Sequence, residues 1–105
     1  MRTERRKKPR FLIRQMIELS MGRENFIPAE GVNISEEGML CRTGESLDLY
    51  SRVSLQMSLL GKKEFSFACE GVVVRCKKNR SAYDTAVEFA DLSDSEKKKI
   101  HTFVN

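Results

Sequence analysis

The feature that most restricts the fold of this chain is a period-2 alternation of apolar and polar residues. In residues 53–59, every second residue is Val, Leu or Met, and the residues between them are Ser or Gln. Similar alternation runs through residues 65–75 and 83–89. Because successive side chains of a strand point to opposite faces, this pattern predicts strands with one buried face. The sequence is therefore that of a mainly β protein.

Three further apolar runs complete the set of predicted strands: 11–19, 26–34 (with a bend at Pro28 or Gly31) and 39–43. Polar or glycine-containing segments separate the runs and are predicted as turns: 21–25, 61–63 and 77–81. Residues 44–52 form a looser connection. The predicted order is thus six short strands joined by short connections.

The period changes at the end of the chain. Ser93 and Glu96 have the spacing of a capping box, and Ile100, Phe103 and Val104 would form one apolar stripe on a short helix. Such a helix is too short to be stable alone, so it must dock on the sheet. These elements predict a six-stranded antiparallel β-barrel with a C-terminal α-helix, although periodicity alone leaves a sandwich or an OB-like barrel open.

The charge of the chain is concentrated at its N-terminus. The 105 residues suffice for one domain. Residues 1–10 carry six Lys or Arg against one Glu, a balance of +5, whereas residues 11–105 carry thirteen basic and fourteen acidic side chains, a balance of −1. A general nucleic-acid binder more often spreads its cations along one face. We therefore expect a flexible basic arm, residues 1–10, that an anion orders, attached to a single domain, residues 11–105.

Several classes of function are disfavoured. No apolar run approaches the roughly 18 to 20 residues that cross a bilayer, and the N-terminus lacks the apolar segment of a signal peptide, so we expect a cytoplasmic protein without membrane contact. Cys41, Cys69 and Cys76 lack metal-like spacing and are expected to be reduced, mostly buried thiols. His101 has no catalytic partners nearby in the sequence, and no triad, metal site or phosphate-binding glycine loop is present. An enzyme is not expected.

The arm has the chemistry to grip an anion. The guanidinium fork of arginine matches phosphate oxygens and also the O6/N7 edge of guanine. Arg6 and Arg10 are four residues apart, which on an extended chain places them roughly 13 Å apart on the same side. Arg5 points the other way and could stack on a base or meet a second ligand. The arm is thus suited to one small, nucleotide-sized dianion.

A polar turn between two predicted strands offers complementary groups. Asn33 supplies an amide and Ser35 a hydroxyl, which together can read a base edge or a ribose. Gly38 suits a positive φ or a close approach of the backbone to a ligand. Taken singly, a basic tail is most often solvated, and Asn and Ser favour turns for local reasons. The occurrence of both segments in one chain favours a shared ligand.

The two segments resemble the two motifs of the PilZ domain, a bacterial receptor for cyclic di-GMP. Residues 6–10 match RxxxR, and residues 33–38 match (D/N)xSxxG, in the family's order and separation. Residues 71–75 and 85–89 resemble the family's long strand and last strand, although Ala86 stands where glycine is common. The resemblance covers nearly the whole chain. It implies a six-stranded antiparallel barrel with a C-terminal helix.

The resemblance also implies the ligand contacts by position: Arg5, Arg6, Arg10, Asn33, Ser35 and Gly38. The arginines of RxxxR would bind phosphate and guanine, and the turn would complete the floor of the site. Arg5, immediately before that motif, would hold a stacked pair of ligand molecules. No metal and no cofactor besides the ligand is implied.

These observations lead to one expected function and two alternatives. We expect a stand-alone PilZ domain, a monomer or weak dimer, whose arm orders on cyclic di-GMP so that an effector protein reads the new surface in second-messenger signalling. One alternative is a degenerate PilZ fold that serves only protein interaction and binds no nucleotide. The other is a small nucleic-acid binder that uses the arm on backbone phosphates, with steep salt dependence.

Overall fold

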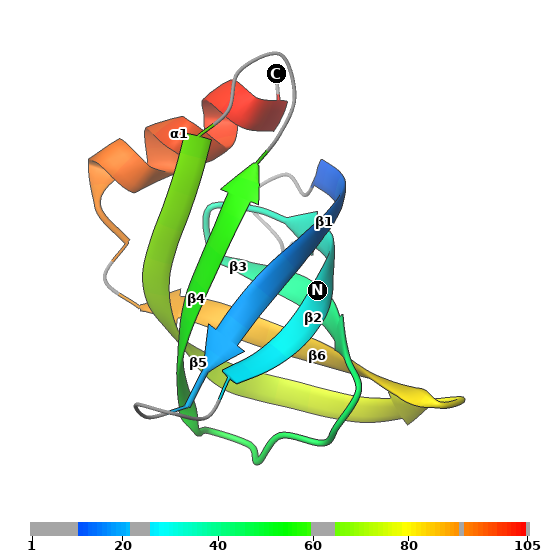
Figure 1. The fold of residues 1–105 in the computed structure, drawn as a ribbon. Coiled ribbons are helices and arrows are strands. Elements are labelled where there is room, and N and C mark those ends of the chain that lie inside the picture. Colours follow the sequence, from blue (N-terminus) through cyan, green and yellow to red (C-terminus); the bar gives the residue numbers. More distant parts are fainter. Residues whose placement is uncertain (1–10, 22–25, 60–64, 91, 105) are drawn as a thin grey trace, which may run out of the picture.

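The barrel predicted from the sequence is present. The computed structural model describes residues 11–21, 26–59, 65–90 and 92–104. Within these residues the chain forms six strands and one helix: β1 (Phe11–Ser20), β2 (Phe26–Ile34), β3 (Gly38–Thr43), β4 (Arg52–Leu59), β5 (Phe65–Asn79), β6 (Ala82–Ala90) and α1 (Asp94–Val104). Neighbouring strands are antiparallel and close in the order β1-β2-β3-β6-β5-β4 (Figure 1). The closed order confirms a barrel and excludes a sandwich.

The interior of the barrel is filled by alternate side chains of the strands. Along β2, Ile27 and Ala29 are buried while the residues on either side of Ile27 are exposed. The buried apolar side chains form one cluster: Ile17, Leu19, Ile27, Ala29, Ile34, Met39, Cys41, Leu47, Val53, Leu55, Val73, Val87 and Ile100. Full burial of one aliphatic side chain contributes about 1.5–3 kcal/mol. Burial of this cluster therefore stabilises the closed barrel.

The terminal helix begins at the predicted cap. The Glu96 amide donates a hydrogen bond of 3.1 Å to Ser93 Oγ, and the Lys97 amide donates one of 3.0 Å to the Ser93 carbonyl. Ile100 belongs to the buried cluster, so the helix docks on the barrel as expected. Among the described residues, no helix has the length and apolar character to span a bilayer.

Strand β5 is longer than the sequence indicated. The segment 77–81 was predicted as a turn, but β5 continues to Asn79. Its polar residues interact across the hairpin: Lys78 Nζ lies 6.0 Å from the centre of the Tyr83 ring, and Asn79 Nδ2 donates a 2.9 Å hydrogen bond to Asp84 Oδ2. Because polar residues lie on both faces of this part of β5, its sequence shows no apolar–polar alternation. The extension of the strand to Asn79 was therefore not predicted.

Two irregularities lie where β1 and β2 approach the predicted polar turn. The register of β1 with β2 shifts between Leu12 and Gln15, and that of β2 with β3 shifts between Gly31 and Asn33. The predicted bend of the second strand therefore falls at Gly31. Such bulges increase the local twist and re-aim side chains, often next to binding sites.

Candidate functional site

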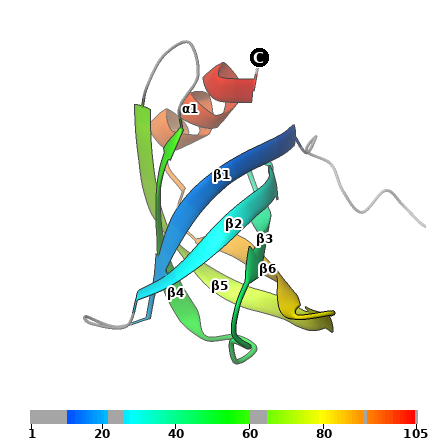
Figure 2. The ribbon, with the colours of Figure 1, turned by 45° about the vertical axis from the view of Figure 1, so that its right-hand side comes forward.

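The start of β1 lies beside the end of β2. Phe11 pairs with Ile34, and Leu12 pairs with Asn33. Figure 2 shows these two strand ends together at the upper right of the barrel. Since the basic arm joins the fold at Phe11, the chain enters the barrel next to the turn that follows β2. We call this region the motif end: Leu12, Asn33 and the turn 34–38.

The predicted arm contacts themselves, Arg5, Arg6 and Arg10, lie outside the described residues, as does the rest of the arm. Their contact with a ligand stays a prediction. The structure does fix the strand to which they are joined. A junction on the far wall of the barrel would have separated RxxxR from the turn, and the pairing of Phe11 with Ile34 excludes that arrangement.

The turn from Ile34 to Gly38 is held by its own hydrogen bonds. The Ser35 amide donates to the Gly38 carbonyl at 2.9 Å, and the Glu37 amide donates to Ser35 Oγ at 3.1 Å. The Phe89 amide of β6 donates to the Glu37 carbonyl at 2.9 Å, which fixes the turn to the barrel. Ser35 is 1% exposed, so its first role is to shape the turn. These hydrogen bonds fix the conformation of the turn and its position on the barrel.

Gly38 is required for packing. A Cβ atom at this position would collide with the Val87 carbonyl oxygen and crowd the Glu88 Cα, both in β6. The φ of Gly38 is not in the left-handed region. The sequence suggested two reasons for this glycine, a positive φ and a close approach of the backbone to a ligand. Gly38 has no positive φ, and the close approach in the structure is between β3 and β6. The glycine permits the turn to sit tightly on the sheet.

Asn33 occupies the centre of the motif end. It is half-buried, it lies between Leu12 of β1 and Leu40 of β3, and it follows the β2 irregularity. Leu12 is 83% exposed, an unusual exposure for a leucine in a strand. No pattern in the sequence indicated this exposure, because the irregularity between Leu12 and Gln15 interrupts the alternation of apolar and polar residues. An apolar side chain is therefore available beside Asn33.

Acidic side chains lie at and beside the turn. Glu37 is exposed, Glu36 is half-buried, and Glu88, the register partner of Gly38, is exposed. Three carboxylates near the turn would repel a dianion. Residues 1–10 carry an excess of five positive charges, opposite in sign to these carboxylates.

The cysteines do not supply a reactive group to this region. All three are free, as predicted, and Cys41 is buried whereas Cys69 and Cys76 are half-buried. Burial, followed by the charge of Cys76, raises the pKa of the Cys41 thiol to about 12. Burial, followed by the charges of Glu96 and Glu70, raises the pKa of Cys69 to about 12. Cys41 and Cys69 therefore stay protonated near neutral pH and are poor nucleophiles.

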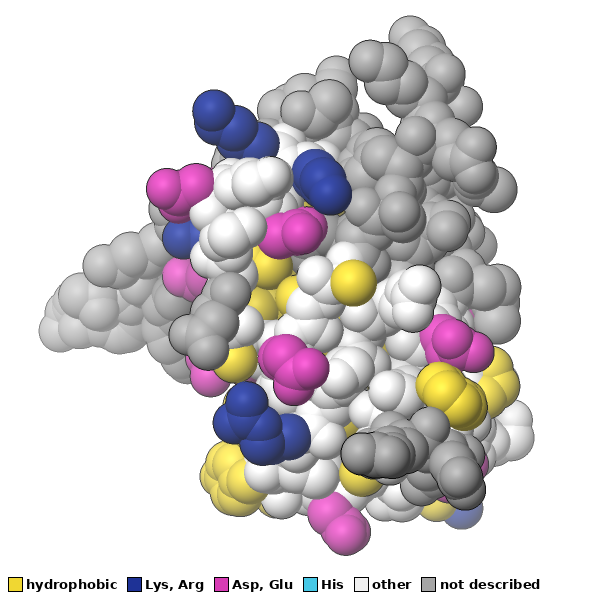
Figure 3. Space-filling view, turned by 60° about the vertical axis from the view of Figure 1, so that its left-hand side comes forward, with side chains coloured by type: hydrophobic (Ala, Val, Ile, Leu, Met, Phe, Trp, Pro, Cys, Tyr) yellow, Lys and Arg dark blue, Asp and Glu magenta, His cyan; other side chains and the backbone are white. Residues whose placement is uncertain are grey.

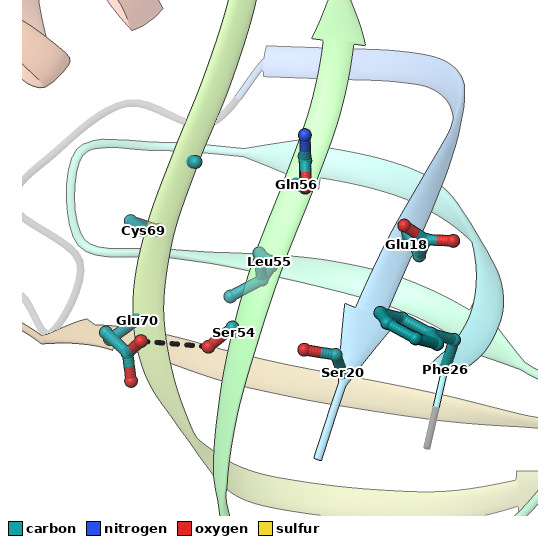
Figure 4. Close-up of a pocket in the computed structure, with 9 residues that line it drawn as sticks. Glu18, Ser20, Phe26, Ser54, Leu55, Gln56, Cys69 and Glu70 are labelled. Carbon is teal, nitrogen blue, oxygen red and sulfur yellow. Dashed lines mark hydrogen bonds between the residues drawn. The ribbon is translucent and has the colours of Figure 1, made fainter. Parts of the chain in front are cut away.

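A depression lies on the outer face of β1, β2, β4 and β5. Its volume is about 380 Å³, and it is lined by Glu18, Ser20, Phe26, Ser54, Leu55, Gln56, Ala68, Cys69 and Glu70 (Figure 4). Ser54 Oγ donates a 2.8 Å hydrogen bond to Glu70 Oε2. Figure 3, which views the molecule from the side of β4 and β5, shows both acidic and basic side chains on this face.

This depression does not suit a nucleotide phosphate. The charged side chains in its lining, Glu18 and Glu70, are both acidic. Glu18 and Ser20 also lie at the end of β1 opposite Phe11, seven and nine residues further along the strand, which is about 24 Å and about 31 Å at about 3.4 Å per residue. The motif end is therefore the candidate site for an anionic ligand.

The family comparison identifies the class of protein. The PilZ domain family matches residues 4–105, which include both motifs, the barrel and the helix. The chain therefore belongs to the PilZ domain family. A search of curated proteins finds no match.

Two solved structures share the fold. The inhibitor of motility MotI/DgrA of Bacillus subtilis superposes with a TM-score of 0.83 at 17% identity, over 99% of this chain and 51% of that one. The PilZ domain of YcgR from Escherichia coli, solved with c-di-GMP, superposes with a TM-score of 0.74 at 12% identity, over 96% and 89% of the two chains. This chain thus spans about half the length of the first protein.

Proposed function

We propose that this chain is a non-enzymatic, cytoplasmic receptor for cyclic di-GMP that signals to a partner protein. The observation that carries the proposal is the pairing of Phe11 and Leu12 with Ile34 and Asn33, because it joins the RxxxR arm to the fold beside the NxSxxG turn. Membership of the PilZ family supports the proposal, as does the shared fold with a PilZ domain solved with c-di-GMP.

The proposed contacts divide between the arm and the turn. Arg6 and Arg10 donate paired hydrogen bonds to phosphate oxygens and to the O6/N7 edge of guanine. The Asn33 amide contacts guanine or ribose from the floor of the site. Ser35 contributes by holding the turn, and Gly38 lets the turn sit close to β6. The arm thus supplies charge, and the turn supplies shape.

Ordering of the arm is the proposed signal. Residues 1–10 are rich in cations and poor in apolar residues, and such a segment gains order only when an anion neutralises it. The ordered arm creates a surface that a partner reads. Ordering consumes part of the interaction energy, so binding is reversible and suited to a switch.

Calorimetric titration with cyclic di-GMP tests this proposal. Removal of a charge-assisted, two-pronged contact costs roughly 2–3 kcal/mol, so Arg6→Ala and Arg10→Ala should each bind at least about 30-fold more weakly than the wild type. Lys8→Ala removes the same charge from the arm outside the RxxxR arginines and should weaken binding only a few-fold.

The same titration tests Arg5. If Arg5 holds a stacked pair of ligands, the wild type binds two molecules per chain and Arg5→Ala binds one. Equal affinities of the wild type and Arg6→Ala would contradict the proposed site. Absence of binding by the wild-type chain would instead favour a PilZ fold used only for protein interaction. Equal competition by a single-stranded oligonucleotide would favour the nucleic-acid alternative.

A further inference from the structure

Two strained residues lie in the connections β3–β4 and β5–β6, outside the turn 34–38. Among the described residues other than glycine, Tyr50 and Arg80 are those with positive φ, at 66° and 64°. This conformation brings the Cβ atom against the backbone and is uncommon for bulky side chains. Strain of this kind persists where the surrounding structure imposes it, and it concentrates at functional sites.

The first strained residue belongs to the turn 48–51. Ser51 donates to the Asp48 carbonyl from both its amide, at 3.3 Å, and its hydroxyl, at 2.6 Å, which makes Leu49 and Tyr50 the central residues of a β-turn. Positive φ at the second central position normally selects glycine or asparagine. The side chains of Leu49 and Tyr50 are nevertheless 53% and 73% exposed. Strand β5 holds the turn, since the Tyr50 amide donates to the Val73 carbonyl at 2.6 Å.

The second strained residue is at the tip of the β5–β6 hairpin. Asn79 pairs with Ala82, so Arg80 and Ser81 form a two-residue loop. Positive φ at the first position alone is typical of a type II′ turn, where glycine is favoured. The turn instead presents an exposed arginine at the end of the hairpin.

The two turns lie along the same stretch of β5, because Tyr50 is hydrogen-bonded to Val73 and Arg80 follows seven residues later, about 24 Å away at about 3.4 Å per residue. The Leu47 amide donates to Cys76 Sγ at 3.4 Å, so the connection before β4 runs along β5 where the hairpin leaves the barrel (Figure 1). Val74 lies on this part of β5 and is 39% exposed. We call this region the loop–hairpin surface. Its members are exposed residues of the turn 48–51 and of the outer part of the β5–β6 hairpin: Leu49, Tyr50, Val74, Arg75, Lys77 and Arg80.

This surface has a local positive charge. Residues 74–84 contain four Lys or Arg and one Asp, a balance of +3, and the rest of residues 11–105 contains nine basic and thirteen acidic side chains, a balance of −4. The one carboxylate of the hairpin, Asp84, is already engaged by Asn79 Nδ2 at 2.9 Å and by Arg42 Nε at 3.6 Å. The connection 44–52 adds one basic and two acidic side chains, so the two segments together carry five basic and three acidic side chains, a balance of +2. The cations of the hairpin are therefore available to an acidic partner.

The hairpin also presents a strand edge. Pairing of β5 with β4 ends at Val72, and beyond Cys76 the described residues provide no strand on that side of β5. Such an edge can add a further strand through main-chain hydrogen bonds. A nucleic acid or a lipid headgroup cannot complete a β-ladder, so the edge and the exposed apolar residues together favour a polypeptide.

We propose that the loop–hairpin surface docks an acidic, amphipathic segment of a partner protein. The segment pairs with the edge of β5 at residues 77–79, its apolar side chains cover Leu49, Tyr50 and Val74, and its carboxylates meet the hairpin cations. The hairpin part of the surface is separated from the motif end by five residues of β3, from the Gly38–Glu88 pair to the Thr43–Tyr83 pair, which span about 17 Å at about 3.4 Å each. The part around Tyr50 and Val74 is nearer, because Val73 pairs with Val87, which in turn pairs with Met39 beside Gly38. Docking is therefore measured in the absence of cyclic di-GMP.

Selection from a random 16-residue peptide library displayed on phage, with the full chain as target, tests the proposal. The enriched peptides should combine Asp or Glu with aliphatic or aromatic residues. Their affinity should fall at least ten-fold for Tyr50→Asn and for Arg80→Asn, whereas both variants should unfold at the same or a higher temperature, because asparagine accepts positive φ. Lys98→Asn, which removes one exposed cation from α1, should bind the peptides like the wild type.

Several results would overturn the proposal. These are enrichment of basic or uncharged peptides, equal peptide binding by the wild type and Tyr50→Asn, or a lower unfolding temperature of both asparagine variants. Tighter binding to an oligonucleotide or to phosphatidylglycerol vesicles than to any peptide would assign the surface to another partner. A wild-type dimer that Tyr50→Asn abolishes in sedimentation would assign it to a second copy of the chain. Titration of Tyr50→Asn with cyclic di-GMP should match the wild type, whichever way the peptide result falls.

Discussion

The turns 34–38 and 48–51 illustrate opposite relations between sequence and structure. In the turn 34–38, Ser35 accepts a hydrogen bond from the Glu37 amide, and a glycine stands where β6 leaves no room for a side chain. In the turn 48–51, a tyrosine adopts a φ of 66° and remains largely exposed. The first turn follows local rules, whereas the second violates them.

Both turns are nevertheless fixed by a strand remote in sequence. The Phe89 amide donates to the Glu37 carbonyl, and the Tyr50 amide donates to the Val73 carbonyl. Tertiary hydrogen bonds thus reinforce a preferred turn in one case and impose an unfavourable one in the other. Violation of a local rule without an evident structural gain is typical of functional surfaces.

The largest effect expected from this contrast concerns glycine. Gly38→Ala should lower the free energy of unfolding by about 1–3 kcal/mol, because the new Cβ collides with backbone atoms of β6. Gly44→Ala is the matched control, since a Cβ atom there meets nothing within 4 Å and should leave stability unchanged or slightly raised. Urea denaturation of both variants measures the difference. Equal stability of the two variants would contradict the packing role of Gly38.

The next effect has the opposite sign. Tyr50→Asn should raise the free energy of unfolding by about 1 kcal/mol, because it relieves the cost of positive φ. Tyr50→Ala removes the same ring but keeps a residue that resists positive φ, and it should give little gain. Thermal unfolding distinguishes the two. A loss of stability in Tyr50→Asn would show that the tyrosine ring is itself a structural requirement.

The contrast also explains how much of the molecule could be predicted from its sequence. Alternation along residues 53–59 and 83–89 gave the strands, because one face of each is buried. The turn 34–38 was located because its residues act locally. The strain at Tyr50 depends on a hydrogen bond to Val73, far along the chain, and no local pattern reports it. The charged extension of β5 was missed for a similar reason.

The candidate site was predicted in part. The motifs themselves were visible, and the resemblance to PilZ domains linked them. That Phe11, where the arm joins the fold, lies beside the turn could be learned only from its pairing with Ile34, and the exposure of Leu12 only from the structure next to the adjacent irregularity. Both depend on strand register, which periodicity does not supply where the alternation is broken.

A smaller effect, on ligand affinity, is expected from the acidic side chains at the turn 34–38. Glu37→Gln should raise the affinity for cyclic di-GMP about two-fold, because it removes an exposed carboxylate from the turn. Glu45→Gln removes an equivalent exposed charge from the connection after β3 and should leave the affinity unchanged. Calorimetry at low ionic strength measures both. Equal gains in the two variants would indicate an effect of net charge alone.

The smallest effect near neutrality concerns the buried thiol between the two ends. The pKa of Cys41 rises from 9.0 to about 12 on folding, so the unfolded chain loses its proton first as the pH increases. The stability that the protonated thiol contributes is complete below pH 9 and is lost as the pH rises from 9.0 towards about 12. Cys41→Ala should therefore show a shallower decline of unfolding temperature between these limits. Parallel declines in both proteins would exclude this source.

Amide chemical-shift mapping by NMR locates the ligand most directly. On addition of cyclic di-GMP, the amide signals of Leu12, Asn33 and Gly38 should shift, while those of Leu49, Tyr50 and Arg80 should stay in place. Shifts confined to the second group, or spread along the acidic depression on β1, β4 and β5, would contradict a site at the motif end.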